Sequence, residues 1–212
     1  MMSDGGNGYS TCREVTVDES LPLLLSYPAR EYAAMRQAPQ VNLTGATQAD
    51  AVTAVGASAH GAKQLDVELT YHFAAVAATA GDCVGVSLLG GGAAAAVIFL
   101  SPTVAVLNNG PCLRDGRPNT KGGFMFGLKA NESFVSLRVL VDGNAVESFA
   151  QYGRAQVSFP GVLRDTGGAA GNITSWNTSV GLLCNASKAG TVDVGVWPLA
   201  FGGAPGGGEG RA

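Results

Sequence analysis

Apolar and polar residues alternate along much of the chain, which is the pattern of half-buried β-strands. The clearest case is residues 64–73, "QLDVELTYHF", in which every second residue from Leu65 to Phe73 is apolar. This period of two predicts a strand with one face in the core and the other in water. Gly, Asn, Asp and Pro separate the runs, so we expect an all-β protein, an antiparallel sandwich or barrel. The shorter runs cover residues 84–89, 95–100, 103–108, 122–128, 133–142, 145–149, 155–159, 179–184 and 191–197.

The first sixty residues follow a different pattern. Residues 13–27, "REVTVDESLPLLLSY", predict two short strands joined by an acidic turn. Residues 28–37, "PAREYAAMRQ", are the one segment that favours a helix, with Pro28 at a suitable first position. Residues 38–63 are polar and rich in alanine and predict a connector. At the other end, residues 200–212 are dominated by glycine and predict a disordered tail.

The composition excludes several function classes. The net charge is −3 over 212 residues, and Lys and Arg form no basic run, which argues against nucleic acid or an anionic membrane as partner. No apolar stretch is long enough for a transmembrane helix. The four cysteines show no CxxC spacing or pairing with histidine, so we expect no metal site and no cofactor.

Five sequons point to a secretory route. The N-terminus, "MMSDGGNGYSTC", has no basic and apolar signal region. Secretory features without a signal peptide predict that the chain is part of a longer protein. The glycosylation candidates are Asn42, Asn131, Asn172, Asn177 and Asn185.

Two carboxylates in residues 137–154, "LRVLVDGNAVESFAQYGR", are the candidates for catalysis. Gly143-Asn144 predicts a two-residue hairpin turn, which places Asp142 opposite Ala145 and Glu147 opposite Leu140. The two carboxylates then become diagonal neighbours at roughly 7–8 Å, inside the approximate 6.5–9.5 Å spacing of an inverting glycosidase. Any polar hairpin face offers such a diagonal, so turn formation and an ion pair explain the pattern without catalysis.

The same stretch resembles the signature strand pair in the C-terminal β-sandwich of glycoside hydrolase family 32, which contains invertases, fructan hydrolases and fructosyltransferases. The family pattern is Leu-Arg-x-Leu-hydrophobic-Asp, then Val-Glu-x-Phe, then a glycine and a basic residue. The residues that match in order are Leu137, Arg138, Leu140, Val141, Asp142, Val146, Glu147, Phe149, Gly153 and Arg154.

Further segments extend the resemblance over about residues 12–198. Residues 64–73 resemble the first sandwich strand, and residues 179–199 resemble the closing strand pair, with Trp197 expected in the core. Residues 12–36 resemble the end of the family's catalytic propeller and the helix that follows it. The resemblance implies a concanavalin-like jelly-roll sandwich. It divides the chain into a propeller remnant (1–27), a helix and connector (28–63), the sandwich (64–199) and the tail (200–212).

The family's catalytic motifs do not occur in this sequence. In the family, an Asn-Asp-Pro-Asn, an Arg-Asp-Pro and a Glu-Cys motif of the propeller supply the three carboxylates. The nearest stretches here, "LRDGR" and "LRDTG", lack the proline, and no Glu precedes a Cys. We therefore expect a module that stabilises a catalytic propeller absent from this sequence and that is inactive alone. Its partners would be that propeller and a sucrose- or fructan-type carbohydrate, and it could assemble into oligomers.

The disulfide, the location of the parent enzyme and the alternative functions remain open. Plant members have a disulfide in this part of the sandwich, which makes Cys83 and Cys112 a candidate pair. The parent enzyme would be extracellular, bound to the cell wall or vacuolar. A lectin-like module that stacks sugar on Trp176 is the alternative function, and a glycosylated structural wall protein is a third.

Overall fold

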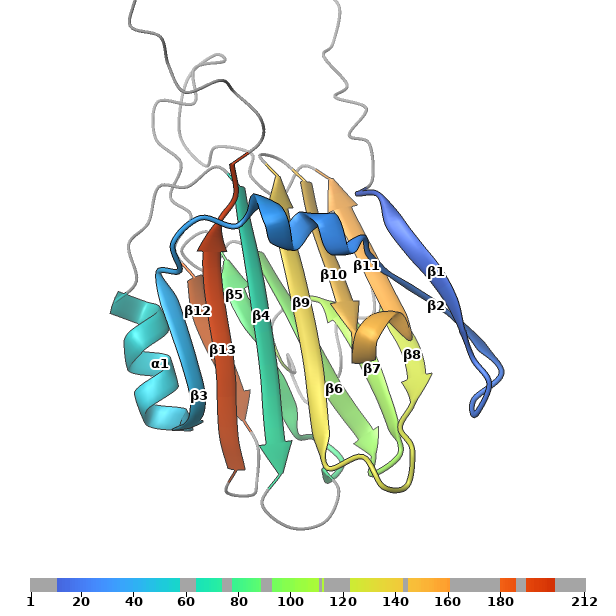
Figure 1. Cartoon of the computed structure of the whole chain (residues 1–212). Coiled ribbons are helices and arrows are strands. Elements are labelled where there is room, and N and C mark those ends of the chain that lie inside the picture. Colours follow the sequence, from blue (N-terminus) through green and yellow to red (C-terminus); the bar gives the residue numbers. More distant parts are fainter. Residues whose placement is uncertain are drawn as a thin grey trace, which may run out of the picture.

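The computed structural model describes residues 11–57, 64–73, 78–88, 93–110, 112, 123–142, 145–160, 180–185 and 190–200. Two antiparallel sheets face each other and enclose one core, so the prediction of an antiparallel β-sandwich is confirmed (Figure 1). One sheet has six strands in the order β11-β10-β9-β4-β13-β3, and the other has five in the order β12-β5-β6-β7-β8. The six-stranded sheet consists of β3 (Val41–Thr47), β4 (Gln64–Phe73), β9 (Phe134–Asp142), β10 (Ala145–Ala150), β11 (Ala155–Pro160) and β13 (Gly190–Pro198). The five-stranded sheet consists of β5 (Cys83–Leu88), β6 (Ala93–Ser101), β7 (Val104–Asn109), β8 (Phe124–Gly127) and β12 (Val180–Asn185).

The core forms from the inward residues of both sheets. On β4 these are the alternating apolar residues that the sequence pattern identified, from Leu65 to Phe73, all with less than a tenth of their surface exposed. Tyr71 and Phe73, both on β4, pack edge to face at a ring distance of 4.9 Å, and Phe73 packs edge to face on Phe99 of the facing sheet at 5.6 Å. Burial of large apolar side chains of this kind contributes about 1.5–3 kcal/mol each, and here it holds the two sheets together.

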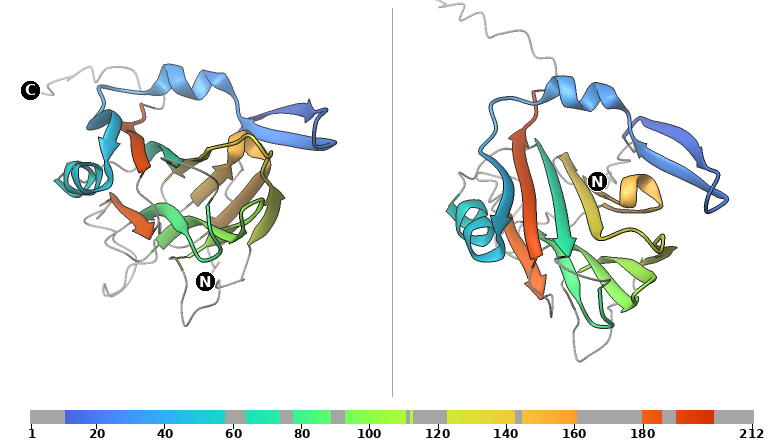
Figure 2. Two further views of the ribbon diagram at one scale, coloured as in Figure 1. Left: turned by 90° about the horizontal axis from the view of Figure 1, so that it is seen from below. Right: turned by 60° about the horizontal axis from the view of Figure 1, so that its bottom comes forward.

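The expected connector over residues 38–63 is wrong in its described part. Residues 41–47 form β3, the edge strand beside β13, and helix α1 (Gln48–Ala57) follows at once. Helix α1 buries Ala51 and Val55 against the edges of both sheets, and Figure 2 shows it closing that side of the sandwich. The helix expected over residues 28–37 is a short 3₁₀ helix, η1 (Arg30–Met35). The sandwich therefore begins at β3 and not at residue 64.

The N-terminal segment lies outside the sandwich. Strands β1 (Arg13–Asp18) and β2 (Leu23–Pro28) pair with each other and with neither large sheet. The hairpin extends from one side of the molecule, and η1 then crosses the outer face of the six-stranded sheet (Figures 1 and 2). The alternation predicted that this outer face lies in water. The structure shows instead that the N-terminal segment covers part of it.

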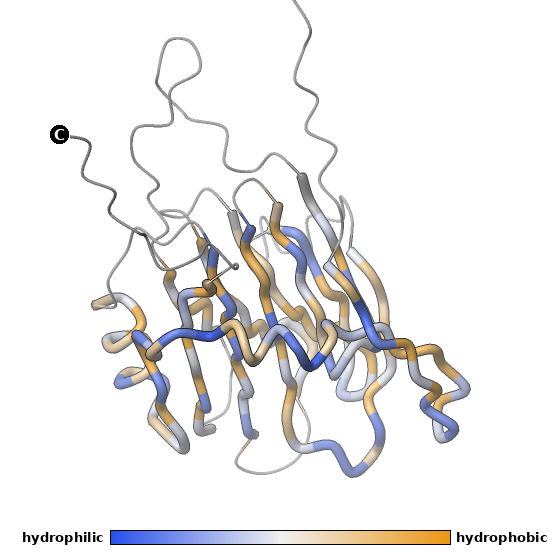
Figure 3. Tube along the Cα trace, turned by 45° about the horizontal axis from the view of Figure 1, so that its top comes forward, coloured by the Kyte–Doolittle hydropathy of each residue, from blue (hydrophilic) through white to orange (hydrophobic). Residues whose placement is uncertain are grey.

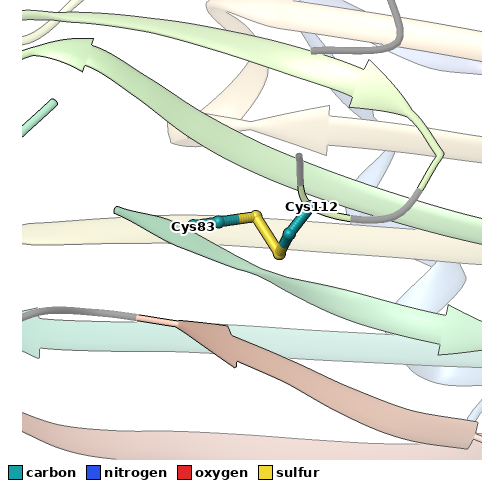
Figure 4. The surroundings of a disulfide bond; sticks show 2 residues. All are labelled: Cys83 and Cys112. Atoms are coloured by element: carbon teal, nitrogen blue, oxygen red, sulfur yellow. A yellow bond between two sulfur atoms is a disulfide. The ribbon is translucent and has the colours of Figure 1, made fainter. Parts of the chain in front are cut away.

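The structure joins Cys83 and Cys112 in a disulfide (Figure 4). Cys83 is the first residue of β5, and the pair packs with Ala96 and Ile98 on the outer side of the five-stranded sheet. A bridge between residues 29 positions apart restricts the unfolded chain and so stabilises the fold.

Candidate functional site

The strand pair β9–β10 has the register that the sequence predicted. Asp142 lies opposite Ala145 and Leu140 opposite Glu147, while Gly143-Asn144 itself lies outside the described residues. The inward residues of the pair, including Leu137 and Val146 of the signature, belong to the main core. The outward residues of the same pair form the candidate site, because Arg138, Asp142 and Glu147 of the signature lie there.

The two carboxylates of the hairpin have separate partners. Asp142 is exposed and accepts a hydrogen bond of 2.9 Å from the Gln64 amide. Glu147 is buried and accepts hydrogen bonds from the Arg13 guanidinium at 2.9 Å and from the Ser158 hydroxyl at 3.1 Å. The backbone N–H of Thr11 donates to it at 3.0 Å. Glu147 is thus engaged by Arg13 and Thr11 of the N-terminal segment and by Ser158 of β11, which favours a structural ion pair over an acid–base role.

Arg138 pairs with Asp66 and not with a carboxylate of its own hairpin. Asp66 is fully buried and accepts two hydrogen bonds from Arg138, at 2.7 and 3.0 Å, and one from Arg36 at 2.8 Å. Burial alone would lower the pKa of Arg138, but the hydrogen bonds and charge of Asp66 raise it above its ordinary value. Two guanidinium groups therefore share one buried carboxylate, and Arg36 also reaches Glu68.

Aromatic rings from the N-terminal segment cover this charged cluster. Tyr27 of β2 packs edge to face on Phe149 at 6.0 Å, and the Arg138 guanidinium lies 5.5 Å from the centre of the Tyr27 ring. Burial raises the pKa of Tyr27 to about 12. On the other side, Arg36 stacks on Trp197 at 3.9 Å. Trp197 therefore lies on the outer face of the sheet, and its expected place in the core is wrong.

Gly153 brings β2 against the sandwich. Its backbone has φ +96°, and a Cβ atom there would lie 2.4 Å from the carbonyl oxygen and 2.8 Å from the nitrogen of Ser26. Only a residue without a side chain allows this approach. The glycine of the signature therefore serves as a contact point for the hairpin.

A third group of ion pairs holds the tip of the hairpin. Asp18 accepts from Lys129 at 3.0 Å and lies 3.5 Å from Arg154. The hydrogen bond from the Ser20 hydroxyl, together with that from Lys129, lowers the pKa of Asp18 from 3.8 to about 2. Arg154 is itself positioned by two hydrogen bonds of 2.6 Å to Glu132. The acidic turn predicted from the sequence is thus attached to the loop after β8.

Apart from Asp142, which bonds to Gln64 of β4, the outward polar residues of the signature and the turn after β10 contact the N-terminal segment. The sequence alone could not reveal this, because each partner is more than a hundred positions away. Only the placement of charges on one face of the hairpin was visible in advance. The signature residues that contact this segment are Arg138, Glu147, Phe149, Gly153 and Arg154.

The hairpin also carries exposed apolar residues. Val17 lies opposite Leu24 in the β1–β2 register and Val15 lies two positions away on the same face. Their exposed fractions are 62%, 70% and 62%, and Figure 3 shows hydrophobic positions along much of the hairpin. Large apolar side chains gathered on an exposed strand pair mark a contact surface.

The remaining candidates are only partly described. Asn42 and Asn131 are exposed, as a glycosylation acceptor must be. Asn172, Asn177 and Trp176 lie outside the described residues, as does the side chain of Asn185. Within the described ranges, no group of His, Cys, Asp and Glu is arranged to hold a metal ion, and no helix is long and apolar enough to cross a membrane.

Comparison with solved structures shows where this fold occurs. The chain is similar to sucrose-6-phosphate hydrolase from Lactobacillus gasseri, with 17% identity and a TM-score of 0.53 over 89% of this chain. It is similar to fructan 1-exohydrolase IIa from Cichorium intybus, with 13% identity and a TM-score of 0.56 over 88% of this chain. It is also similar to exo-inulinase from Aspergillus awamori, with 12% identity and a TM-score of 0.51 over 89% of this chain.

These matches establish the fold of the chain. It has the fold of the C-terminal β-sandwich of family 32 glycoside hydrolases, as the signature implied. The chain spans 33%, 40% and 34% of the three matched structures. No protein-family model matches the sequence, and no curated protein matches it.

Proposed function

We propose that the chain is the accessory sandwich of a β-fructofuranosidase-type enzyme and that it stabilises a catalytic propeller through the β1–β2 hairpin. The observation that carries the proposal is that this hairpin is attached to the sandwich and yet exposes large apolar side chains. The Arg13–Glu147 and Asp18–Lys129 pairs fix it to the sandwich, and Val15, Val17 and Leu24 remain exposed. A propeller blade that continues this hairpin would cover these apolar residues.

The chemistry of the chain agrees with an accessory role. The carboxylate motifs of the family are absent from the sequence, and the paired carboxylates that remain, Asp142 and Glu147, are engaged by Gln64 and Arg13. Any double displacement at a fructosyl bond would belong to the propeller of the parent enzyme. That enzyme would act on sucrose or a fructan outside the cell, in the wall or in the vacuole.

Fructose release tests the catalytic part of the proposal. The purified chain is expected to release no fructose from sucrose or inulin, because the sequence lacks the family's carboxylate motifs and Asp142 and Glu147 are engaged by Gln64 and Arg13. Activity that is present in the wild type and lost in Asp142→Asn would contradict the proposal. Equal background in the two proteins supports it.

Self-association tests the hairpin surface. Without a propeller, the exposed apolar residues should drive concentration-dependent association in sedimentation experiments, and Val15→Ser with Leu24→Ser should abolish it while leaving the fold intact. Met125→Ser is the matched control, since Met125 is 66% exposed on β8. A wild-type chain that stays monomeric at all concentrations would argue against an unpartnered interface.

A further inference from the structure

The β1–β2 hairpin is held on the sandwich by side-chain contacts and not by strand pairing. Among the described strands, β1 and β2 pair only with each other, and Figures 1 and 2 show the hairpin at one side of the molecule. It lies against β10, the turn after β10 and the loop after β8, a surface here called the cradle. The hairpin is thus related to the cradle as a ligand is to its receptor. The cradle residues that contact the hairpin are Lys129, Glu147, Phe149, Tyr152, Gly153 and Arg154.

The charges of the hairpin and the cradle are complementary and set the direction of binding. At one end, Arg13 of the hairpin pairs with Glu147 of the cradle at 2.9 Å. At the other end, Asp18 of the hairpin pairs with Lys129 of the cradle at 3.0 Å. The hairpin therefore supplies the cation at one end and the anion at the other. A hairpin bound in the reverse direction would bring like charges together, which opposes binding.

The shapes of the two surfaces also match between these ion pairs. The Ser26 backbone fills the space above Gly153, where a Cβ atom would lie 2.4 Å from the Ser26 carbonyl oxygen. The Tyr27 ring lies 6.0 Å from the Phe149 ring and 6.1 Å from the Tyr152 ring. Tyr152 has a left-handed backbone, with φ of 55°, at this point of contact. Charge and shape together make the hairpin a specific ligand for the cradle.

The link between the hairpin and the sandwich can extend. It consists of residues 29–35, which include η1, and no residue of η1 is buried. Tyr32 and Met35 pack only partly against the sheet, and 3₁₀ helices have poor hydrogen-bond geometry. Arg36, which follows η1, is fixed to the sandwich by Asp66 at 2.8 Å. When extended, the link would reach about 20 Å from this anchor, far enough to carry the hairpin away from its own cradle.

We propose that two copies of the chain exchange their β1–β2 hairpins, so that each hairpin binds the cradle of the other copy. Every hairpin contact in such a dimer is one that the single chain already makes, and two-fold symmetry lets both copies make it. The buried Glu147 keeps its cation in the dimer as it does in the monomer. A single chain holds its own hairpin at the higher effective concentration. We therefore expect exchange at high protein concentration and after the hairpin has been released.

The exchange does not rest on the accessory role proposed above. The hairpin needs only a cradle, which its own chain or a second copy can supply. The side chains of Val15, Val17 and Leu24 are largely exposed on the bound hairpin, so binding to the cradle does not need them. Association through these apolar residues and exchange of hairpins can therefore be separated by substitution. In a parent enzyme, a propeller blade that held the hairpin would oppose the exchange.

Charge reversal in two different copies tests the exchange. Arg13→Glu and Glu147→Arg each bring like charges together, so neither variant should hold its own hairpin. In a mixture, an exchanged dimer restores both pairs, because each hairpin meets an opposite charge on the other copy. The mixed dimer should form at least about tenfold more tightly than either variant with itself. Both variants also carry Val15→Ser and Leu24→Ser, which removes association through the apolar residues.

A mixture of Arg13→Glu with Asp18→Lys, in the same background, is the matched control. These variants change the net charge by the same amounts and in the same directions as the first mixture, but both cradles stay unchanged. Mixing them restores neither broken pair, so the control should form no mixed dimer. Native mass spectrometry measures the mixed dimer, and hydrogen exchange of the β2 amides shows whether the hairpin is bound in it.

Three results would overturn the proposal. The first is a mixture of Arg13→Glu and Glu147→Arg that stays monomeric. The second is an equal amount of mixed dimer in the control, which would indicate general attraction between opposite charges. The third is a mixed dimer whose β2 amides remain unprotected. If Glu147→Arg fails to fold, Asp18→Lys mixed with Lys129→Asp repeats the test at the tip of the hairpin, where Lys129 is 33% exposed.

Discussion

Replacement of Gly153 by alanine should detach the N-terminal hairpin from the sandwich. The added Cβ would lie 2.4 Å from the Ser26 carbonyl oxygen, whereas ordinary contacts begin at 3.4 Å, so β2 must move by about 1 Å. The left-handed backbone adds about 1–2 kcal/mol, and the forced displacement adds roughly 1–3 kcal/mol. Since the fold is held by the sandwich core, the hairpin should yield first.

Gly81→Ala separates the two contributions. Gly81 has φ +95°, close to the +96° of Gly153, but no atom lies within 4 Å of the position that a Cβ would take there. The Gly81→Ala variant should therefore lose about 1–2 kcal/mol of unfolding free energy, from the left-handed backbone alone. Denaturant unfolding measures both variants, and hydrogen exchange of β2 amides reports detachment. Equal losses of stability in the two variants, with β2 equally protected, would refute the steric argument.

Three further predictions concern the contacts of the same hairpin. Glu147→Gln should lower the free energy of unfolding in denaturant by about 2 kcal/mol, because the Arg13 guanidinium loses its charged partner. In a double-mutant cycle with Arg13→Met, most of this loss should appear as the interaction energy between the two residues. The Ser20 hydrogen bond lowers the pKa of Asp18 from 3.8 to about 2. The ionised carboxylate therefore stabilises the hairpin tip above pH 3.8, and this effect is lost as the pH falls towards 2. Asp18→Asn should remove that part of the pH dependence of hydrogen exchange at the β1 amides. Burial raises the pKa of Tyr27 to about 12, so the stability that the neutral phenol contributes is intact below pH 10 and lost as the pH rises towards 12. In a spectrophotometric titration, Tyr27→Phe should remove one phenol that ionises late. Ionisation of Tyr27 near pH 10 in the wild type would contradict a docked hairpin.

The strands of the sandwich could be predicted from sequence because each has a period of two and a turn at its end. Residues 64–73 form β4 with the expected bounds, and the β9–β10 register follows from Gly143-Asn144. Helix α1 was missed because its stability comes from the burial of Ala51 and Val55 at the sheet edges and not from amphipathic repetition. A signal for its start was present, since the Thr47 hydroxyl bonds to Asp50 three residues later.

The outer face was misjudged for a different reason. Alternation distinguishes core residues from all others, but it does not separate a surface in water from a surface that binds another segment. Asp66 is polar and fully buried because Arg138 and Arg36 neutralise it. Such pairing depends on residues far apart in the chain, so no local pattern predicts it. The candidate site was therefore visible in the sequence only as an unexplained group of charges.

The use of ion pairs to hold the hairpin agrees with the exposure of its apolar residues. If Val15, Val17 and Leu24 must stay available for another domain, these residues cannot also attach the hairpin to the sandwich. The attachment then depends on Arg13, Asp18 and the ring of Tyr27, which are held by the signature residues across the interface. Ion pairs contribute less to stability than apolar burial but specify position more strictly. The signature residues thus fix the position of the hairpin on the sandwich.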